Sequence, residues 1–231
     1  MQKVSILLLT IDRYDLTREY VGNALRDAGY PFELCVTDNG STDKRIIEWV
    51  EQQNPNVFFK NEENKGTTQS LNRMIEANPS DAWVFIGNDI ELPKDWLKKL
   101  VETTEKIPQS GVVGINWRPI EFEKVDINGT EVLLSGNTFG TMFITKQTRD
   151  RVGRFCEDYG TYGLWDSDYS IRCNLAGLVN YYLCGVRSEH KGNDVEETTP
   201  YRLMKNASIS KAKPIFEENV RRYKETNNYF I

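Results

Sequence analysis

The sequence predicts an α/β fold with a mostly parallel sheet, helices on both faces, and a mixed second half. Short apolar runs, the pattern of strands buried on both faces, alternate with stretches whose apolar residues recur at helical spacing. This alternation continues to residue 115 and is typical of βαβ units, whose crossovers are nearly always right-handed. The 231 residues, 39% hydrophobic and 27% charged, are enough for one large domain with a packed core.

Five strands are expected in the first half, where each apolar run is bounded by polar residues. They are Val4–Leu9, Phe32–Thr37, Val57–Phe59, Trp83–Ile86 and Gly111–Ile115. The first helix is expected to begin at a cap formed by Asp15 and to end at Gly29, because aspartate is a favoured N-cap and glycine a favoured stop. For the same reason Ser41 or Thr42 is expected to cap the second helix.

Two more helices and a hairpin follow. Gly66 leads into the third helix, and Pro93 suits the first turn of the fourth, since proline has no N–H to leave unpaired there. The dipeptide Asn128-Gly129 between alternating runs predicts a β-hairpin. Beyond the hairpin we expect a helix over Leu164–Ala176 and a strand over Val179–Leu183.

Residues 1–200 are expected to form one domain, with a first half (1–115) that binds the ligand and a mixed half (116–200). A basic helical extension (201–231) is expected to follow. The extension carries seven lysines and arginines against three glutamates, a net charge of +4 that leaves −9 for residues 1–200. Two interpretations are open: a surface for an anionic partner, such as an anionic acceptor or a membrane, and a solvated helix.

Composition narrows the class of protein. The net charge of −5 argues against a general nucleic-acid coat protein, which needs a basic surface. No apolar run approaches the ~18 residues of a membrane-spanning helix, and charged residues interrupt the first run before any signal-peptide cleavage site. The four cysteines are far apart and form no CxxC pair, which favours reduced thiols in a cytoplasmic protein over disulfides or a zinc site.

Polar residues follow the predicted strands at their carboxyl ends, where ligands bind to open parallel sheets. They are Thr10 and Asp12 after the first strand, Asp38 and Asn39 after the second, Gly66 after the third, and Asn88 and Asp89 after the fourth. Acidic and amide-rich loops suit a hydroxyl-rich ligand and a cation. The chain has no Walker loop, no GxGxxG after the first strand and no GxSxG elbow, which argues against P-loop NTPases, Rossmann dehydrogenases and serine hydrolases.

Several segments, in order along the chain, resemble the motifs of GT-A glycosyltransferases of family 2 over residues 4–192. They are Val4–Thr10 (VSILLLT), Cys35–Asp43 (CVTDNGSTD), Asn64–Gly66 with Asn72, Val84–Leu97, Val152–Phe155, Tyr162–Arg172, Ala176-Gly177 and His190. The resemblance implies a Rossmann-like GT-A fold. It also implies a metal-dependent, inverting transfer of a sugar from a nucleotide-sugar donor, typically a UDP-sugar, to an acceptor hydroxyl.

The resemblance further implies roles for individual residues. Asp166 matches the catalytic base, supported by Asp168 and Arg172. Asp89 and His190 match ligands of a Mn²⁺ or Mg²⁺ ion that bridges the diphosphate of the donor. A carboxylate oxygen and an imidazole nitrogen are ligands that suit Mn²⁺.

Seven residues match donor-binding positions of the family. They are Thr10, Asp12, Asp38, Asn39, Gly66, Asn72 and Asn88. Thr10 would lie against the nucleobase, Asp38 would accept a hydrogen bond from it, and Gly66 would let the backbone approach the nucleoside.

Two positions depart from the family pattern. Gly87 stands where the first acid of the DxD motif is expected, and Trp165 stands where a glutamate commonly precedes the base. A non-catalytic nucleotide- or sugar-binding module with a weakened metal site therefore stays open. A sugar-1-phosphate nucleotidyltransferase would need a glycine-rich loop after the first strand, which residues 11–14 lack. The acceptor is open among a glycan, a lipid-linked intermediate, a protein and modified DNA.

Each site residue also has a structural alternative. Asp89 and Asp166 could cap helices, Asp38 could hold an Asx turn with Gly40, and His190 could be an exposed loop histidine.

Overall fold

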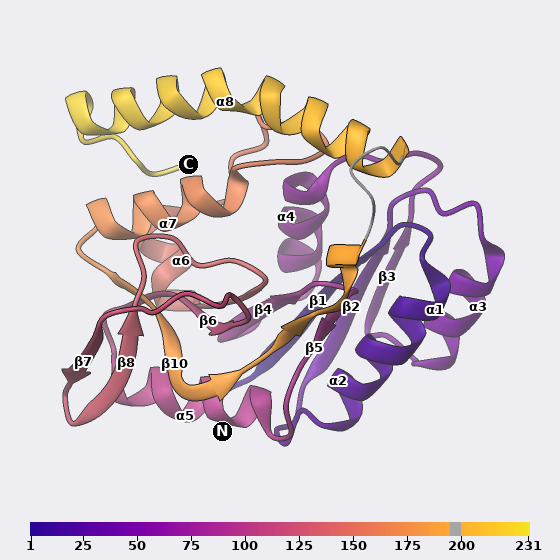
Figure 1. Cartoon of the computed structure of the whole chain (residues 1–231), viewed down its shortest axis with the longest axis horizontal. Coiled ribbons are helices and arrows are strands. Elements are labelled where there is room, and N and C mark those ends of the chain that lie inside the picture. Colours follow the sequence, from indigo (N-terminus) through magenta and orange to yellow (C-terminus); the bar gives the residue numbers. More distant parts are fainter. Residues whose placement is uncertain (195–199) are drawn as a thin grey trace.

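The computed structural model describes residues 1–194 and 200–231, with side chains 193–201 excluded, and confirms the α/β class. Within these residues nine strands form one sheet in the order β3-β2-β1-β4-β9-β6-β10-β8-β7 (Figure 1). They are β1 (Val4–Thr10), β2 (Glu33–Asp38), β3 (Val57–Lys60), β4 (Ala82–Ile86), β6 (Ser110–Asn116), β7 (Lys124–Ile127), β8 (Thr130–Leu134), β9 (Thr141–Thr145) and β10 (Val179–Arg187). A separate antiparallel pair consists of β5 (Ile90–Glu91) and β11 (Glu189–His190).

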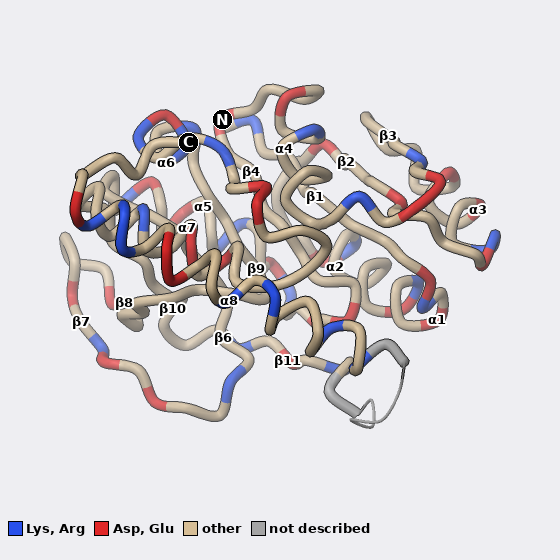
Figure 2. Tube along the Cα trace, turned by 90° about the horizontal axis from the view of Figure 1, so that it is seen from above, with Lys and Arg blue, Asp and Glu red and all other residues tan. Residues whose placement is uncertain are grey.

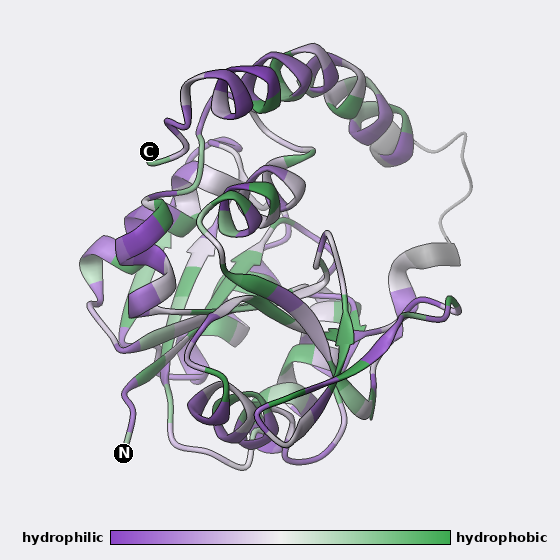
Figure 3. Ribbon diagram, turned by 90° about the vertical axis from the view of Figure 1, so that its left-hand side faces the viewer, coloured by the Kyte–Doolittle hydropathy of each residue, from purple (hydrophilic) through white to green (hydrophobic). Residues whose placement is uncertain are grey.

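Helices cover both faces of the sheet (Figures 1 and 3). They are α1 (Tyr14–Leu16), which continues through a π-helical stretch (Thr17–Val21) into α2 (Gly22–Arg26), α3 (Lys44–Gln52), α4 (Thr67–Ala77), α5 (Trp96–Lys106), α6 (Lys146–Val152), α7 (Trp165–Leu175), a 3₁₀-helix (Lys191–Asp194) and α8 (Pro200–Thr226). The helices α1, α2, α3 and α5 lie on one face, and α4, α6 and α7 lie on the other. The long helix α8 lies outside α7.

The hydrophobic core has two parts, one on each face of the sheet. Along β1, Ile6 and Leu8 pack in the core under α2, α3 and α5, whereas Leu7 points into the core under α4 and α7. Alternate side chains of a strand point to opposite faces, so a strand covered on both sides has no polar face. This burial, about 1.5–3 kcal/mol for each side chain, explains the continuous apolar run that marks β1 in the sequence.

The parallel strands β3, β2, β1 and β4 are found where they were predicted, but the second half departs from the simple alternation. The antiparallel strand β9 lies between β4 and β6, and β10 is parallel to β6. The hairpin β7–β8 is confirmed, since Asn128 and Gly129 both have positive φ, as a tight two-residue turn requires. Strands β5, β9 and β11 and helix α6 were not predicted from the sequence.

The predicted starts of two helices were wrong. Asp15 lies inside α1, whose first residue is preceded by Arg13 in the left-handed conformation, with no side-chain cap. Pro93 does not lie in the first turn of α5, which begins at Trp96 after a left-handed Asp95. In both cases the residue before the helix has a positive φ, which is not a helical conformation, so the helix cannot begin earlier in the chain.

The cap of α3 also differs from the prediction. Asp43, not Ser41 or Thr42, is the N-cap, and its carboxylate accepts a hydrogen bond from the backbone of the helix. Ser41 and Thr42 are held by other partners: the Ser41 hydroxyl hydrogen-bonds to Asp38, and the Thr42 amide donates to Asp12 (2.8 Å). Asp12 therefore satisfies helix-terminal amides from a neighbouring loop, a role that spacing along the chain does not reveal.

The basic C-terminal segment is packed on the rest of the chain. Helix α8 runs along α7 and buries Ala212, Asn219 and Tyr223. Basic and acidic residues are mixed along this helix (Figure 2). Arg221 is paired with glutamates one turn away on each side. No helix among the described residues is long and apolar enough to cross a bilayer.

Candidate active site

A cavity of 360 Å³ opens beyond the carboxyl end of β4. Its wall includes Asn88 and Asp89 after β4, Trp117 and Phe139 from the second half, Asp166 on α7, His190 on β11, and Arg202 and Lys205 on α8. This place is the one where ligands bind in open α/β sheets. Four of the ten residues predicted for the site, Asn88, Asp89, Asp166 and His190, therefore line one cavity.

The short antiparallel pair β5–β11 brings Asp89 and His190 together although 100 residues separate them. His190 lies opposite Ile90 in the ladder, and the Lys191 amide donates to the Asp89 carbonyl (2.8 Å). As a result the His190 Nε2 lies 3.7 Å from Asp89 Oδ1, and the imidazole packs on the Trp117 ring at 4.8 Å between centroids. His190 is thus an ordered, mostly buried residue of the cavity wall and not an exposed loop histidine.

The second oxygen of Asp89 faces a cation. Arg13 Nη1 lies 2.8 Å from Asp89 Oδ2, and both side chains are largely buried. Gly192 also lies against the Asp89 carboxylate, so close that a Cβ at position 192 would overlap it. Gly87, where the family pattern has an acid, has room for a side chain only if Ile90 shifts, since a Cβ there would lie 2.9 Å from Ile90 Cγ1.

The residues fit a divalent cation with few protein ligands. Burial lowers the pKa of His190 and so favours the neutral imidazole, the form that binds metals, and Nδ1 has no hydrogen-bond partner among the described residues. The described part of the chain contains no group of three metal-ligating side chains. Asp89 and His190 can therefore supply two ligands, and a donor diphosphate would have to supply others.

Asp166 lies in the first turn of α7 and faces the same cavity. Leu164, with a positive φ, precedes the helix, so Asp166 is not the N-cap and the capping alternative is wrong. Its Oδ1 accepts a hydrogen bond from the Ser167 amide (2.8 Å). Burial raises the pKa of Asp166, and the Arg118 charge opposes this shift. A carboxylate whose pKa is raised is a stronger base than an exposed one.

Tyr162 lines the cavity together with Asp89 and Asp166. Burial, followed by the charges of Asp166 and Asp89, raises the pKa of Tyr162 to about 12. The phenol is therefore neutral at physiological pH and can donate a hydrogen bond.

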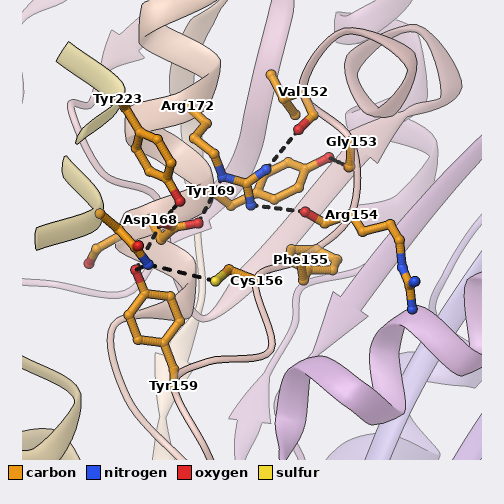
Figure 4. A network of polar contacts seen from close by, with 12 residues as sticks. Val152, Gly153, Arg154, Phe155, Cys156, Tyr159, Asp168, Tyr169, Arg172 and Tyr223 are labelled. Atoms are coloured by element: carbon orange, nitrogen blue, oxygen red, sulfur yellow. Dashed lines mark hydrogen bonds and ion pairs between the residues drawn. The ribbon is translucent and has the colours of Figure 1, made fainter. Parts of the chain in front are cut away.

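A buried network fixes the helix that carries Asp166 (Figure 4). Asp168 and Arg172 are both 0% exposed, and Arg172 Nε donates to Asp168 Oδ2 at 2.8 Å. Tyr159 and, from α8, Tyr223 donate to Asp168 Oδ1 at 2.9 and 3.0 Å. Arg172 also donates to the backbone carbonyls of Val152, the last residue of α6, and Arg154 (2.7 and 2.9 Å). Both charges are thus paired and hydrogen-bonded, as their burial requires.

The residues predicted to contact the nucleobase form a cluster at the ends of β1 and β2. Thr10 Oγ1 donates to Asp38 Oδ1 (2.9 Å), and the Ser41 amide donates to Asp38 Oδ2 (2.9 Å). Asp38 is 2% exposed and holds the turn through Ser41, not through Gly40 as the Asx-turn alternative has it, and its contact with a nucleobase stays a prediction. One lone pair of Oδ2 has no partner among the described residues, which leaves an acceptor for a ligand N–H.

The close approach at Gly66 is to the backbone of this chain. Gly66 has a φ of 92°, and a Cβ there would lie 2.5 Å from the Gly160 carbonyl oxygen. The glycine therefore admits a backbone segment of the second half, and its contact with a nucleoside stays a prediction. Asn39 supports this loop, since its Nδ2 donates to the Gly66 carbonyl (3.4 Å) and its Oδ1 accepts from Ser70 (3.1 Å).

We expect Gly66→Ala to lower the free energy of unfolding by about 1–3 kcal/mol, through strain at positive φ and the clash with Gly160. Denaturant unfolding measures this change. Gly177→Ala is the matched control, because Gly177 also has positive φ (72°) but open space around a Cβ. An equal loss in both variants would show that the contact with Gly160 contributes nothing.

Asn72 does not line the cavity, and its role at the donor site stays a prediction. It is 1% exposed, its Nδ2 donates to the Phe155 carbonyl (2.9 Å), and its Oδ1 accepts from the Phe155 amide (3.0 Å). The side chain therefore clamps α4 to the loop before α7. Asn88, in contrast, lines the cavity, and its Nδ2 donates to Thr17 (3.2 Å).

Unsatisfied polar atoms gather around the cavity. Among the described residues, two buried polar atoms without a partner, Trp117 Nε1 and His190 Nδ1, lie on the cavity wall. Three others belong to Asn137, Thr138 and Thr141, which flank the lining residues 139 and 140 in the chain, and the remaining three belong to Gln2, Thr37 and Arg149, which do not line the cavity. Each such group costs free energy unless a ligand or water binds it. Their concentration here is what a ligand site requires.

Sequence reasoning missed three cations at the site. Arg13 pairs with Asp89, and Arg202 and Lys205 of α8 line the cavity. Lys205 Nζ lies 4.7 Å from the centre of the Tyr162 ring. The positive charge of residues 201–231 was the available signal, and the fold places part of it over the site.

Comparisons with known proteins agree with this arrangement. The model of the family described as glycosyl transferase family 2 matches residues 5–160. A curated relative, a glucosyl-dolichyl phosphate glucuronosyltransferase of Haloferax volcanii, is 28% identical over 116 residues, which are 48% of this chain and 37% of the relative.

Solved structures share the fold. A mannosyltransferase of Pyrobaculum calidifontis in complex with GDP-Man and Mn²⁺ has a TM-score of 0.65 at 17% identity and covers 84% of this chain and 58% of its own. GalNAc-T7 with UDP, GalNAc and Mn²⁺ also has a TM-score of 0.65, at 15% identity, over 87% of this chain and 46% of its own. Staphylococcus aureus TarS 1–349 in complex with UDP-GlcNAc has a TM-score of 0.58 at 15% identity, and the match covers 91% of this chain and 71% of the TarS chain.

At these identities the structural matches establish the GT-A fold alone. The chain spans 37% of the curated relative and about half of the first two structures. The family model, however, matches more than half of this chain, from β1 to the loop before α7. The chain therefore belongs to glycosyl transferase family 2.

Proposed function

We propose that the protein transfers a sugar from a nucleotide-sugar donor, a UDP-sugar in the first instance, to an acceptor hydroxyl with inversion at the anomeric carbon. The observation that carries the proposal is that Asp89, His190 and Asp166 line one cavity beyond the parallel strands. The donor diphosphate would lie near Asp89 and the cations of α8, and the acceptor near Asp166.

The departing diphosphate gains negative charge as the glycosidic bond breaks. A Mn²⁺ or Mg²⁺ ion held by Asp89 and His190 would supply Lewis-acid stabilisation of that charge. Arg202 and Lys205 line the cavity and add positive charge there, which favours the same transition state in a partly buried site.

The acceptor hydroxyl needs a base, because it is a poor nucleophile at neutral pH. Asp166 is the carboxylate that faces the cavity without an ion pair, and its raised pKa suits proton removal. General base catalysis of this kind is typically worth about 10²–10⁴-fold. Attack from the Asp166 side, opposite the diphosphate, would invert the anomeric centre.

One alternative has a specific observation in its favour. Gly87 removes an acid from the metal motif, and Arg13 already neutralises Asp89, so a nucleotide- or sugar-binding module without turnover is the second candidate. Release of nucleotide from a nucleotide-sugar donor, with or without an acceptor, separates the two, since a binding module shows none.

The first experiment is thermal unfolding with UDP, GDP, CMP, dTDP and their common sugars, each with and without Mn²⁺. At a ligand concentration 100 times its Kd, we expect stabilisation of about 2.7 kcal/mol, a shift of several degrees in Tm. The shift should require Mn²⁺, occur with one nucleotide family, and be lost in Asp89→Ala. Glu91→Ala, whose carboxylate pairs with Lys191 outside the cavity, is the matched control.

The possible results differ in what they contradict. A nucleotide shift that is equal with and without Mn²⁺ would rule out the metal role of Asp89 and His190 but keep the donor site. The absence of a shift with every nucleotide would contradict the proposed function itself.

A further inference from the structure

A second hollow of 230 Å³ adjoins the first cavity at Asp166. The two share Phe139, Tyr162, Trp165 and Asp166, so the Asp166 carboxylate stands in the wall between them. In an inverting transfer the acceptor hydroxyl must attack the anomeric carbon from the side opposite to the departing diphosphate. A base between two hollows can contact a hydroxyl that arrives from the second one.

The second hollow contains a cation with no charged partner. Arg118 lines it, and among the described residues its guanidinium makes no hydrogen bond and no ion pair. The guanidinium carbon lies over Phe139, 3.5 Å from the ring centre, which favours this position. Its charge reaches Asp166, because it lowers the pKa that burial raises.

The rest of the hollow has the groups that bind sugars. Asn137 Nδ2 donates to the Ser167 hydroxyl at 2.7 Å, which places an amide and a hydroxyl on its wall. Tyr162 adds an aromatic ring. Aromatic faces with a few fixed neutral polar groups are the usual pattern of a small-molecule site, and an arginine is the side chain that best recognises a carboxylate or a phosphate.

We propose that the second hollow, lined by Arg118, Asn137, Tyr162 and Ser167, binds the acceptor, and that this acceptor is a saccharide with an anionic substituent that pairs with Arg118. The substituent is a carboxylate or a phosphate, and both have the oxygens that a guanidinium binds in pairs. The inference rests on the proposed function, because it names the substrate that Asp166 would deprotonate.

The experiment measures transfer from the donor selected by thermal unfolding to matched acceptors. Each set contains a methyl glycoside, the corresponding methyl uronide and the corresponding 6-phosphate, in the gluco and galacto series. We expect one charged member of a set to have a KM at least tenfold below that of its neutral counterpart. The comparison of uronide with phosphate identifies which anion is bound.

Arg118→Gln is expected to raise the ratio of the KM for the charged acceptor to the KM for the neutral one about tenfold, as loss of a charge-assisted pair requires. Arg73→Gln is the matched control, since Arg73 also stacks on a phenylalanine (3.7 Å from the Phe59 ring centre) but lies outside both hollows. Arg118→Lys, which keeps the charge, should retain part of the preference.

A purely electrostatic role of Arg118 on Asp166 gives a different result. In that case Arg118→Gln would move the acid limb of the pH profile of kcat to higher pH for charged and neutral acceptors alike. The ratio of their KM values would not change, and this result would overturn the proposal. Equal KM values for charged and neutral acceptors in the wild type, or no transfer to any of them while the donor is hydrolysed, would also overturn it. If the donor is not hydrolysed either, the proposed function itself fails and the inference falls with it.

Discussion

Replacing Asp166 with asparagine is expected to reduce kcat for sugar transfer by about 10²–10⁴-fold and to leave nucleotide affinity unchanged. The amide keeps the shape of the carboxyl and its hydrogen bond from the Ser167 amide, but it cannot take a proton from the acceptor. Initial rates with saturating donor and the nucleotide-induced shift in Tm measure the two quantities. Asp150→Asn is the control, because Asp150 lies on the surface in a pair with Lys146.

The same substitution, Asp166→Asn, is expected to lower activity but to raise stability at pH 7. Burial raises the pKa of Asp166, so the stability it contributes is fully present below the unfolded-state pKa, near 3.9, and is lost as pH rises through the folded-state pKa. Asp166→Asn should therefore unfold at a higher temperature than the wild type at pH 7, with the difference shrinking toward pH 4. The acid limb of wild-type activity should lie above the ordinary range of aspartate.

Two results would contradict this account of Asp166. An Asp166→Asn variant that retains more than a tenth of the wild-type kcat would show that another group takes the proton. A variant less stable than the wild type at pH 7 would show that the charged carboxylate is well solvated or paired, contrary to its position in the cavity wall.

Asp168→Asn is expected to cause the largest loss of stability, about 3–5 kcal/mol, which lowers Tm by about 10 °C. The substitution leaves the Arg172 guanidinium buried without its counter-charge, and Tyr159 and Tyr223 then donate to a neutral amide. Calorimetry and urea unfolding measure the change. Glu218→Gln, in an exposed pair with Arg221, should leave Tm unchanged.

A double substitution separates the cost of the orphaned charge from the value of the pair. Asp168→Asn combined with Arg172→Met should recover much of the loss, because removal of both buried charges is often neutral. If the double variant is as unstable as the single one, packing and hydrogen bonds to the backbone, and not the unpaired charge, account for the effect of Asp168.

The first half of the fold could be predicted because each strand there is covered on both faces and reads as an apolar run, as β1 does with Ile6, Leu7 and Leu8. The hairpin could be predicted because positive φ at Asn128 and Gly129 leaves a sequence signature. Strand β9 could not, because its pairing with β4 and β6 depends on partners some 30–60 residues away in the chain, and no local pattern records them.

The candidate site divides in the same way. Asp89 comes directly after a predicted strand and Asp166 lies at the start of a predicted helix, and both line the cavity. Asn72 and Asp12 have the residue types of a polar site, but their hydrogen bonds go to Phe155 and to the start of α3. Residue type alone cannot tell a ligand contact from a buried clamp. Arg118 went unnoticed because a lone arginine in a loop has no pattern.

The hydrogen bond from Tyr223 to Asp168 has a consequence for synthesis on the ribosome. The helix that carries Asp166 needs a partner that is translated more than fifty residues later, on α8. Until residue 223 has left the exit tunnel, Asp168 and Arg172 are assembled without the hydroxyl that completes their cluster and without the helix that covers it. The nascent chain can therefore form its parallel strands early, but the helix that carries Asp166 reaches its final order only after α8 has been synthesised.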